Sequence, residues 1–179
     1  MKKGGIGGAN TKTGLHFETR ASLETLLEAM PNYEIRKISG QAGEGVFYKG
    51  ELVARSFKQH AFYKFLEEKG VNWKSIVSAK LLPDNALLVI VRDTLFIVEV
   101  KFQQIGGSVD EKLQTCLFKK LQYTKLVKDL GYMVEYIYVL DDAWFNKPKY
   151  KDVFDFITYA GCHYRFNTLP LAWLGLPQE

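Results

Sequence analysis

The stretch "LLPDNALLVIVRDTLFIVEVKFQ", residues 81–103, decides the fold of this chain. Both of its ends are rich in Val, Ile, Leu and Phe, and "RDT" lies between them. This pattern predicts two strands, 85–92 and 94–103, joined by a tight turn. The second strand begins as a buried strand does, but near its end charged Glu99 and Lys101 alternate with apolar Val100 and Phe102. Charged side chains therefore interrupt one face of a strand that otherwise reads as core.

The expected register of this hairpin brings a third charge to the same place. If Arg92 and Asp93 form a two-residue turn, Asp84 lies opposite Lys101 and Ala86 lies opposite Glu99. Directly opposed residues share a face of a sheet, as do residues two apart. We therefore expect Asp84, Glu99 and Lys101 to stand together at the open end of the hairpin, whereas a shift of one residue would separate them. The other face is apolar and should be a core face, with Leu87, Val89, Val91, Val98, Val100 and Phe102.

This set of side chains suits metal-assisted chemistry. Two neighbouring carboxylates repel one another unless a cation lies between them. Mg²⁺ usually takes one or two protein carboxylates and leaves its other positions to water and phosphate oxygens. A lysine beside such a site can orient or deprotonate an attacking water, or stabilise charge on a phosphate. The pattern favours hydrolysis of a phosphodiester; the alternative is a buried Glu–Lys pair with a structural role.

The rest of the chain predicts a single α/β domain over residues 1–179, with a central mixed sheet flanked by helices. A glycine-rich arm covers 1–13, a core about 14–140, and a C-terminal helix and strand extension 141–179. Apolar periodicity and turn residues predict the elements. They are helices at 15–30 (with Thr13 as N-cap), 57–69, about 73–80, from Ser108 (with Glu111 in a capping box) and 150–159, and strands at 33–39, 43–56 (a hairpin), 132–140 and 162–167.

Pro83-Asp84, followed after fourteen residues by Glu99-Val100-Lys101, resembles the motif of the PD-(D/E)XK nuclease superfamily, which includes many type II restriction endonucleases. The core of that family is a helix, a strand hairpin that carries the motif, a second helix and another strand (αβββαβ), and this order spans about residues 14–140 here. The resemblance implies a Mg²⁺-dependent endonuclease that cuts double-stranded DNA, with Mn²⁺ able to substitute. It implies catalytic roles for Asp84, Glu99 and Lys101, and metal binding by Asp84, Glu99 and Val100.

Two further residues are candidates through the same resemblance. In many members an acidic residue of the first helix joins the metal site; Glu18 matches it here, with Glu24 as a second choice. Gln103 follows Lys101 by two residues, so it shares that face, as a glutamine does in some members. Glu18 could equally be a solvated carboxylate at a helix start, and Gln103 an ordinary polar residue at a strand end.

Contacts to DNA are expected from two regions. Lys112, Lys119 and Tyr123 fall near one side of the helix after the motif at helical spacing, although a solvated lysine face is the plainer interpretation. Asn10, Lys12 and Thr13 lie in the glycine-rich arm, where small residues let the backbone approach phosphate, although a mobile terminus would look the same. Neither region has a readable base code.

Composition sets wider limits. The net charge of +4, from 24 basic and 20 acidic residues, permits a polyanionic partner without requiring one. Two cysteines, Cys116 and Cys162, make no disulfide framework and read as buried thiols. We find no secretory signal and no apolar run long enough to span a bilayer, so we expect a cytoplasmic protein.

Partners and alternatives follow from the size of the chain. One site of this kind cuts one strand, so cutting both requires a homodimer or a partner subunit. Two other functions stay open: a DNA repair or junction-resolving nuclease with the same metal site, and a non-catalytic DNA-binding or interaction module in which the charged triplet is structural.

Overall fold

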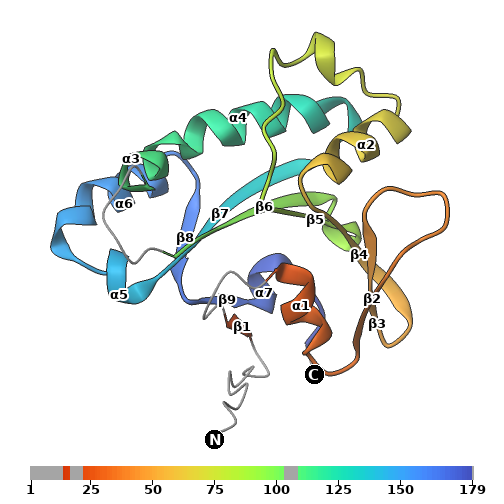
Figure 1. Ribbon diagram of the computed structural model, residues 1–179, viewed down its shortest axis with the longest axis horizontal. Helices are drawn as coiled ribbons and strands as arrows, with labels where there is room; N and C mark the ends of the chain where they lie inside the picture. The colour runs from red at the N-terminus through yellow and green to blue at the C-terminus, as the bar shows by residue number, and fades with distance from the viewer. Residues whose placement is uncertain (1–13, 17–21, 103–108, 179) are drawn as a thin grey trace, which may run out of the picture.

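A mixed sheet of seven strands runs through the centre of the protein, in the order β2-β3-β4-β5-β6-β7-β8 (Figure 1). The structure is a computed structural model and describes residues 14–16, 22–102 and 109–178. Each pair of neighbouring strands from β2 to β6 is antiparallel, whereas β7 pairs parallel to β6 and β8 pairs parallel to β7. The strands are β2 (Tyr33–Arg36), β3 (Glu44–Tyr48), β4 (Glu51–Phe57), β5 (Asn85–Val89), β6 (Thr94–Lys101), β7 (Met133–Leu140) and β8 (His163–Phe166). The predicted α/β fold class is confirmed.

Helices cover both faces of this sheet (Figure 1). They are α1 (Leu23–Glu28), α2 (His60–Glu68), α3 (Val109–Lys112), α4 (Cys116–Val127), α5 (Asp142–Phe145), α6 (Lys151–Tyr159) and α7 (Leu171–Leu174). Helices α2, α4 and α6 contribute to the core on one face, and α1 and α7 to the core on the other. None of the helices in the described ranges has the length and apolar character needed to cross a membrane.

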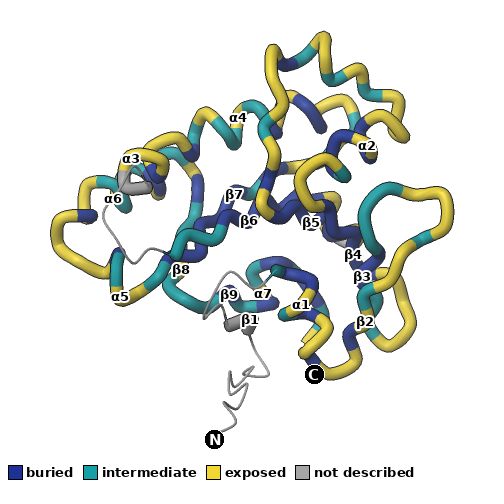
Figure 2. The backbone as a smooth tube through the Cα atoms, in the orientation of Figure 1, coloured by how far each residue is buried: buried dark blue, intermediate teal, exposed yellow. Residues whose placement is uncertain are grey.

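The hairpin β5–β6 is apolar on both sides because it lies between these two cores. Ala86, Leu88, Leu95 and Ile97 face the core of α2 and α4, whereas Leu87, Val89, Phe96 and Val98 face the core of α1 and α7. Figure 2 shows the central strands buried and the outer sides of the helices exposed. A charge on either face of β6 therefore needs a specific partner.

The register of this hairpin differs by two residues from the expected one. Ala86 pairs with Ile97, and Val89 pairs with Thr94. The reason is the connection: Ile90–Arg92 form a 3₁₀ turn and Asp93 is left-handed, with φ of 46°, so four residues rather than two join the strands. Val91 accordingly lies in the turn and not on a core strand. A shift of two residues preserves which side chains share a face.

Three expected helices are shorter than the sequence pattern indicated. Leu15 lies in strand β1 (Gly14–His16), which pairs with β9 (Thr168–Pro170), and helix α1 begins only after Ser22, whose Oγ accepts from the Thr25 amide. Backbone pairing with a distant strand overrides local periodicity there. The segment from Trp73 forms only a 3₁₀ turn to Ser75, since so short a segment nucleates helix poorly. Phe57 ends β4, so α2 begins at His60. The expected caps Thr13 and Ser108 lie outside the described residues.

The C-terminal segment 141–178 packs into the same domain as the rest of the chain. Strand β8 extends the main sheet beside β7. Leu171 and Leu174 of α7 are buried in the core that α7 shares with α1. The segment therefore packs on both faces of the sheet, with α6 on the same face as α4 and α7 on the opposite face.

Candidate active site

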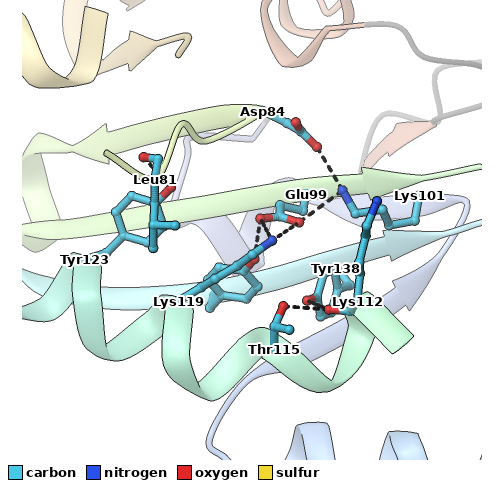
Figure 3. A network of polar contacts seen from close by, with 10 residues as sticks. Leu81, Asp84, Glu99, Lys101, Lys112, Thr115, Lys119, Tyr123 and Tyr138 are labelled. Carbon is cyan, nitrogen blue, oxygen red and sulfur yellow. Dashed lines mark hydrogen bonds and ion pairs between the residues drawn. The ribbon is translucent and has the colours of Figure 1, made fainter. Parts of the chain in front are cut away.

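The three charged residues predicted from the hairpin lie together at one end of β6 (Figure 3). The ammonium group of Lys101 lies 3.2 Å from Oδ2 of Asp84 and 3.0 Å from Oε2 of Glu99. Asp84 directly precedes β5, and its side chain is 51% exposed, whereas that of Glu99 is 5% exposed. The site thus joins an open carboxylate to a buried one through a single lysine.

Two further residues hold the Glu99 carboxylate. Nζ of Lys119, on α4, lies 2.7 Å from Oε1 and 3.0 Å from Oε2. The hydroxyl of Tyr136, on β7, donates a hydrogen bond to Oε1. A buried carboxylate with two ammonium groups and a hydroxyl around it is well compensated for its loss of hydration.

Tyr136 is a site residue that the sequence analysis missed. Strand β7 runs parallel to β6, with Ile97 opposite Tyr136 and Glu99 opposite Tyr138. Tyr136 and Tyr138 therefore stand on the face that carries Glu99 and Lys101, and their rings meet edge to face at 5.3 Å. The alternation in "YIY" indicates that the two tyrosines share a face. Nothing in the sequence fixes the register of two parallel strands joined by helices.

The charges of the site shift its pKa values in opposite directions. Burial alone would raise the pKa of Glu99, but the ammonium groups of Lys101 and Lys119 and the Tyr136 hydroxyl bring it below its ordinary value. Burial alone would lower the pKa of Lys101, but Glu99 and Asp84 raise it above its ordinary value. Near neutral pH Glu99 is therefore a carboxylate and Lys101 an ammonium ion.

The three residues after the motif that were expected to contact DNA, on α3 and α4, differ in their positions relative to this site. Lys119 was expected to contact DNA, and here it binds Glu99. Lys112 is exposed, and Figure 3 shows its side chain extending from the helix toward the end of β6 where Lys101 lies. Tyr123 is buried, at 1% exposure, and its hydroxyl donates to the Leu81 carbonyl at 3.1 Å. Tyr123 is therefore a core residue, which corrects the expectation that it contacts DNA.

Two tyrosines fix the chain just before Asp84. The Leu81 carbonyl accepts from the hydroxyls of Tyr63, at 3.2 Å, and Tyr123, at 3.1 Å. The Leu81 amide in turn donates to the Tyr63 hydroxyl at 2.8 Å. Tyr63 lies on α2 and Tyr123 on α4. Although residues 81–84 belong to no helix or strand, two helices hold their first residue in place.

Five of the predicted site residues lie outside the described residues: Glu18, Gln103, Asn10, Lys12 and Thr13.

Glu24, the second choice from the first helix, does not join the site. It lies on the opposite face of the sheet, where it accepts from Ser56 and forms an ion pair of 2.8 Å with Lys58.

The donor atoms of the site fit Mg²⁺ in type. Asp84 and Glu99 offer carboxylate oxygens, and Val100 can offer only its backbone carbonyl because its hydrocarbon side chain has no donor atom. Mg²⁺ takes such hard oxygen ligands and needs few from the protein. Within the described ranges, no cluster of three or more His, Cys, Asp or Glu residues could hold a metal ion. A cation that binds Glu99 would also have to displace the ammonium group of Lys119 or Lys101 from one of the Glu99 oxygens.

The chain was compared with family models, curated proteins and solved structures, and none of them matches it.

Proposed function

We propose that this protein is a Mg²⁺-dependent endonuclease that hydrolyses phosphodiester bonds of double-stranded DNA, as type II restriction enzymes and their cleavage subunits do. The observation that carries the proposal is the meeting of Asp84 and Glu99 on the Lys101 ammonium group, within 3.2 Å. The order of α1, the hairpin β5–β6, α4 and the parallel strand β7 agrees with the core that the motif implies.

Each residue of the triplet has a distinct part in this proposal. Asp84, Glu99 and the Val100 carbonyl would hold the metal, Mg²⁺ or Mn²⁺. When bound, the metal would supply Lewis-acid polarisation of the phosphodiester and a hydrolytic nucleophile. Glu99 is ionised and needs no proton loss before it binds a cation.

Lys101 is better suited to holding charge than to removing a proton. Its raised pKa keeps the ammonium form at neutral pH. An ammonium ion beside two carboxylates can orient the attacking water through a hydrogen bond and stabilise the negative charge that develops on the phosphate. Deprotonation of the water by Lys101 would require this proton to leave first.

DNA binding and assembly follow from the same proposal. Exposed Lys112 would contact a phosphate beside the site. Because one site cuts one strand, the protein would act as a homodimer or with a partner subunit.

A non-catalytic DNA-binding or interaction module is the second candidate, and one observation favours it. Both Glu99 oxygens already have close partners, in Lys119, Lys101 and Tyr136. In this alternative the cluster is a buried ion-pair network that specifies the packing of α4 on the sheet.

Plasmid cleavage separates these candidates. We expect the wild-type protein with Mg²⁺ to cut, and Glu99→Ala and Lys101→Ala to lose activity. Glu51→Gln and Lys125→Met change the same charges at exposed positions and should cut normally. Cleavage that persists in either site variant would contradict the assignment of the site. An inactive wild type that binds no Mg²⁺ would support the module.

Mapping the fragments distinguishes the nuclease classes. Fixed cut positions on linear duplex indicate a restriction enzyme, whereas activity confined to branched or mismatched DNA indicates a repair or junction-resolving enzyme.

A further inference from the structure

Lys119 occupies the position on Glu99 where a cation bound by both carboxylate oxygens would lie. Its ammonium group lies 2.7 Å from one carboxylate oxygen and 3.0 Å from the other, so it bridges both. Tyr136 approaches Oε1 from β7, and Lys101 approaches Oε2 from the same strand as Glu99. Lys119 is the partner that comes from outside the sheet, since it belongs to α4.

The charge count makes Lys119 the cation that a metal ion would replace. Asp84 and Glu99 carry two negative charges, and Lys101 and Lys119 carry two positive ones, so the four groups are neutral together. A divalent cation added to all four would create a strong local excess of positive charge. Lys101 contacts two carboxylates, whereas among the described residues the ion pair of Lys119 is with Glu99 alone. Release of Lys119 therefore breaks the smaller number of ion pairs.

The released side chain can reach a new anion. The Lys119 side chain is 23% exposed, and lysine carries its charge on a flexible four-carbon stem. Lys112 precedes it by seven residues and extends toward the same end of β6 (Figure 3). The two ammonium groups would then lie where DNA phosphate has to approach Glu99.

We propose that Lys119 is an exchangeable counter-ion. It neutralises Glu99 while no divalent cation is bound. When a divalent cation binds at Glu99, the Lys119 ammonium group moves to a DNA phosphate. This inference rests on the proposed function and adds a role that the motif does not contain. Metal binding and DNA binding become coupled through one side chain, because the cation that occupies Glu99 also frees a phosphate ligand.

Calorimetry with Mn²⁺ and no DNA is the first test. We expect Lys119→Met to bind Mn²⁺ at least about fivefold more tightly than wild type, since the competing ammonium group is gone. Lys125→Met, on the exposed side of the same helix, changes the net charge equally and should show no such gain. Unchanged or weaker binding by Lys119→Met would overturn the inference.

DNA binding with and without metal is the second test. With Ca²⁺ and a short duplex checked for integrity on a gel, Lys119→Met should bind DNA more weakly. The salt dependence of log K should also fall by about one, the value for one phosphate contact. Without a divalent cation, Lys119→Met should match Lys125→Met, because Lys119 is then held by Glu99. Equal weakening in both conditions would make Lys119 an ordinary phosphate ligand and contradict the exchange.

A measurement on the wild-type protein avoids any question of folding in the variants. Acetylation of lysines, followed by peptide mass spectrometry, should label Lys119 faster after Mn²⁺ is added, whereas Lys125 should not change. Constant labelling of Lys119 would contradict its release.

The outcomes also separate this inference from the proposed function. If wild-type protein binds Mn²⁺ and Glu99→Gln does not, but Lys119→Met binds as wild type does, only the exchange is wrong. If wild-type protein binds no divalent cation, the proposed function and the exchange are both wrong.

Discussion

The hydroxyl of Tyr136 on β7 donates to Oε1 of Glu99 on β6, so neighbouring parallel strands share a buried hydrogen bond to a charged group. Tyr136 is fully buried, and burial together with the negative charge of Glu99 raises its pKa far above its ordinary value. The hydroxyl therefore stays protonated and acts as a permanent donor. It helps to fix the orientation of a carboxylate that Lys119 and Lys101 also contact.

Tyr136→Phe tests this bond. Loss of a hydrogen bond to a charged group should lower the free energy of unfolding by about 1.5–3 kcal/mol. Tyr138→Phe is the matched control: its hydroxyl donates to the Lys112 carbonyl at 3.2 Å, a neutral bond for which we expect about 0.5–1.5 kcal/mol. Urea unfolding followed by circular dichroism measures both. Equal losses in the two variants would show that the charge on Glu99 adds nothing to the bond.

Asp84→Asn should separate catalysis from stability. The side chain is half exposed, and exposed ion pairs contribute about 0–1 kcal/mol, so we expect a nearly unchanged urea midpoint. Under the proposed function, DNA cleavage should fall about 100-fold or more, because a metal ligand is lost. Cleavage at the wild-type rate with intact folding would remove Asp84 from the metal site.

Stability should depend on pH through Glu99. Its ordinary pKa is 4.5, and its pKa in the folded protein is lower because Lys101, Lys119 and Tyr136 outweigh the effect of burial. The stability that this shift contributes is fully present above pH 4.5 and is lost as the pH falls through the lower folded value. Urea unfolding at a series of acidic pH values should therefore show a smaller loss for Glu99→Gln than for wild type. Glu24, whose pKa is also lowered, accounts for part of the loss that remains.

Removal of an ammonium group should also weaken the acid dependence. Lys119→Met takes away one cause of the lowered Glu99 pKa, so the folded pKa moves back toward the ordinary value of 4.5 and Glu99 should contribute a smaller loss of stability on acidification than in wild type. An identical acid transition in the two proteins would contradict the charge network.

A divalent cation should stabilise the fold in proportion to its binding. Under the proposed function, saturation of the site to about 100 times its dissociation constant adds about 2.7 kcal/mol. Thermal unfolding with increasing Mg²⁺ or Mn²⁺ should shift upward in wild type, return after chelation with EDTA, and stay constant in Glu99→Gln. A shift of the same size in Glu99→Gln would place the bound metal elsewhere.

The sequence predicted the convergence of Asp84, Glu99 and Lys101 even though the register was wrong, because the error was two residues and side chains alternate with a period of two. The sequence did not predict the turn at Ile90–Arg92, because its apolar residues Ile90 and Val91 look like a continuation of the strand. Whether Glu18 or Gln103 joins the site stays a prediction.

What depended on distant packing could not be predicted. In the sequence, Lys119 looks like one of several lysines on the solvated face of a helix. Only the packing of α4 against the sheet brings it to Glu99. Tyr123 fell on the expected side of that helix, yet the same seating buries it. Leu15 fitted a helical period, but it pairs with Leu169 from the other end of the chain.

The two tyrosines at Leu81 have a consequence for anyone who wishes to re-engineer this protein. The approach to Asp84 is tied to α2 and α4 through Tyr63 and Tyr123, while the connecting turn of the hairpin lies at the other end of β5. The turn at 90–93 is therefore the place for an inserted peptide or a label. A designer who wants to move the carboxylate of Asp84 has to work on the helices.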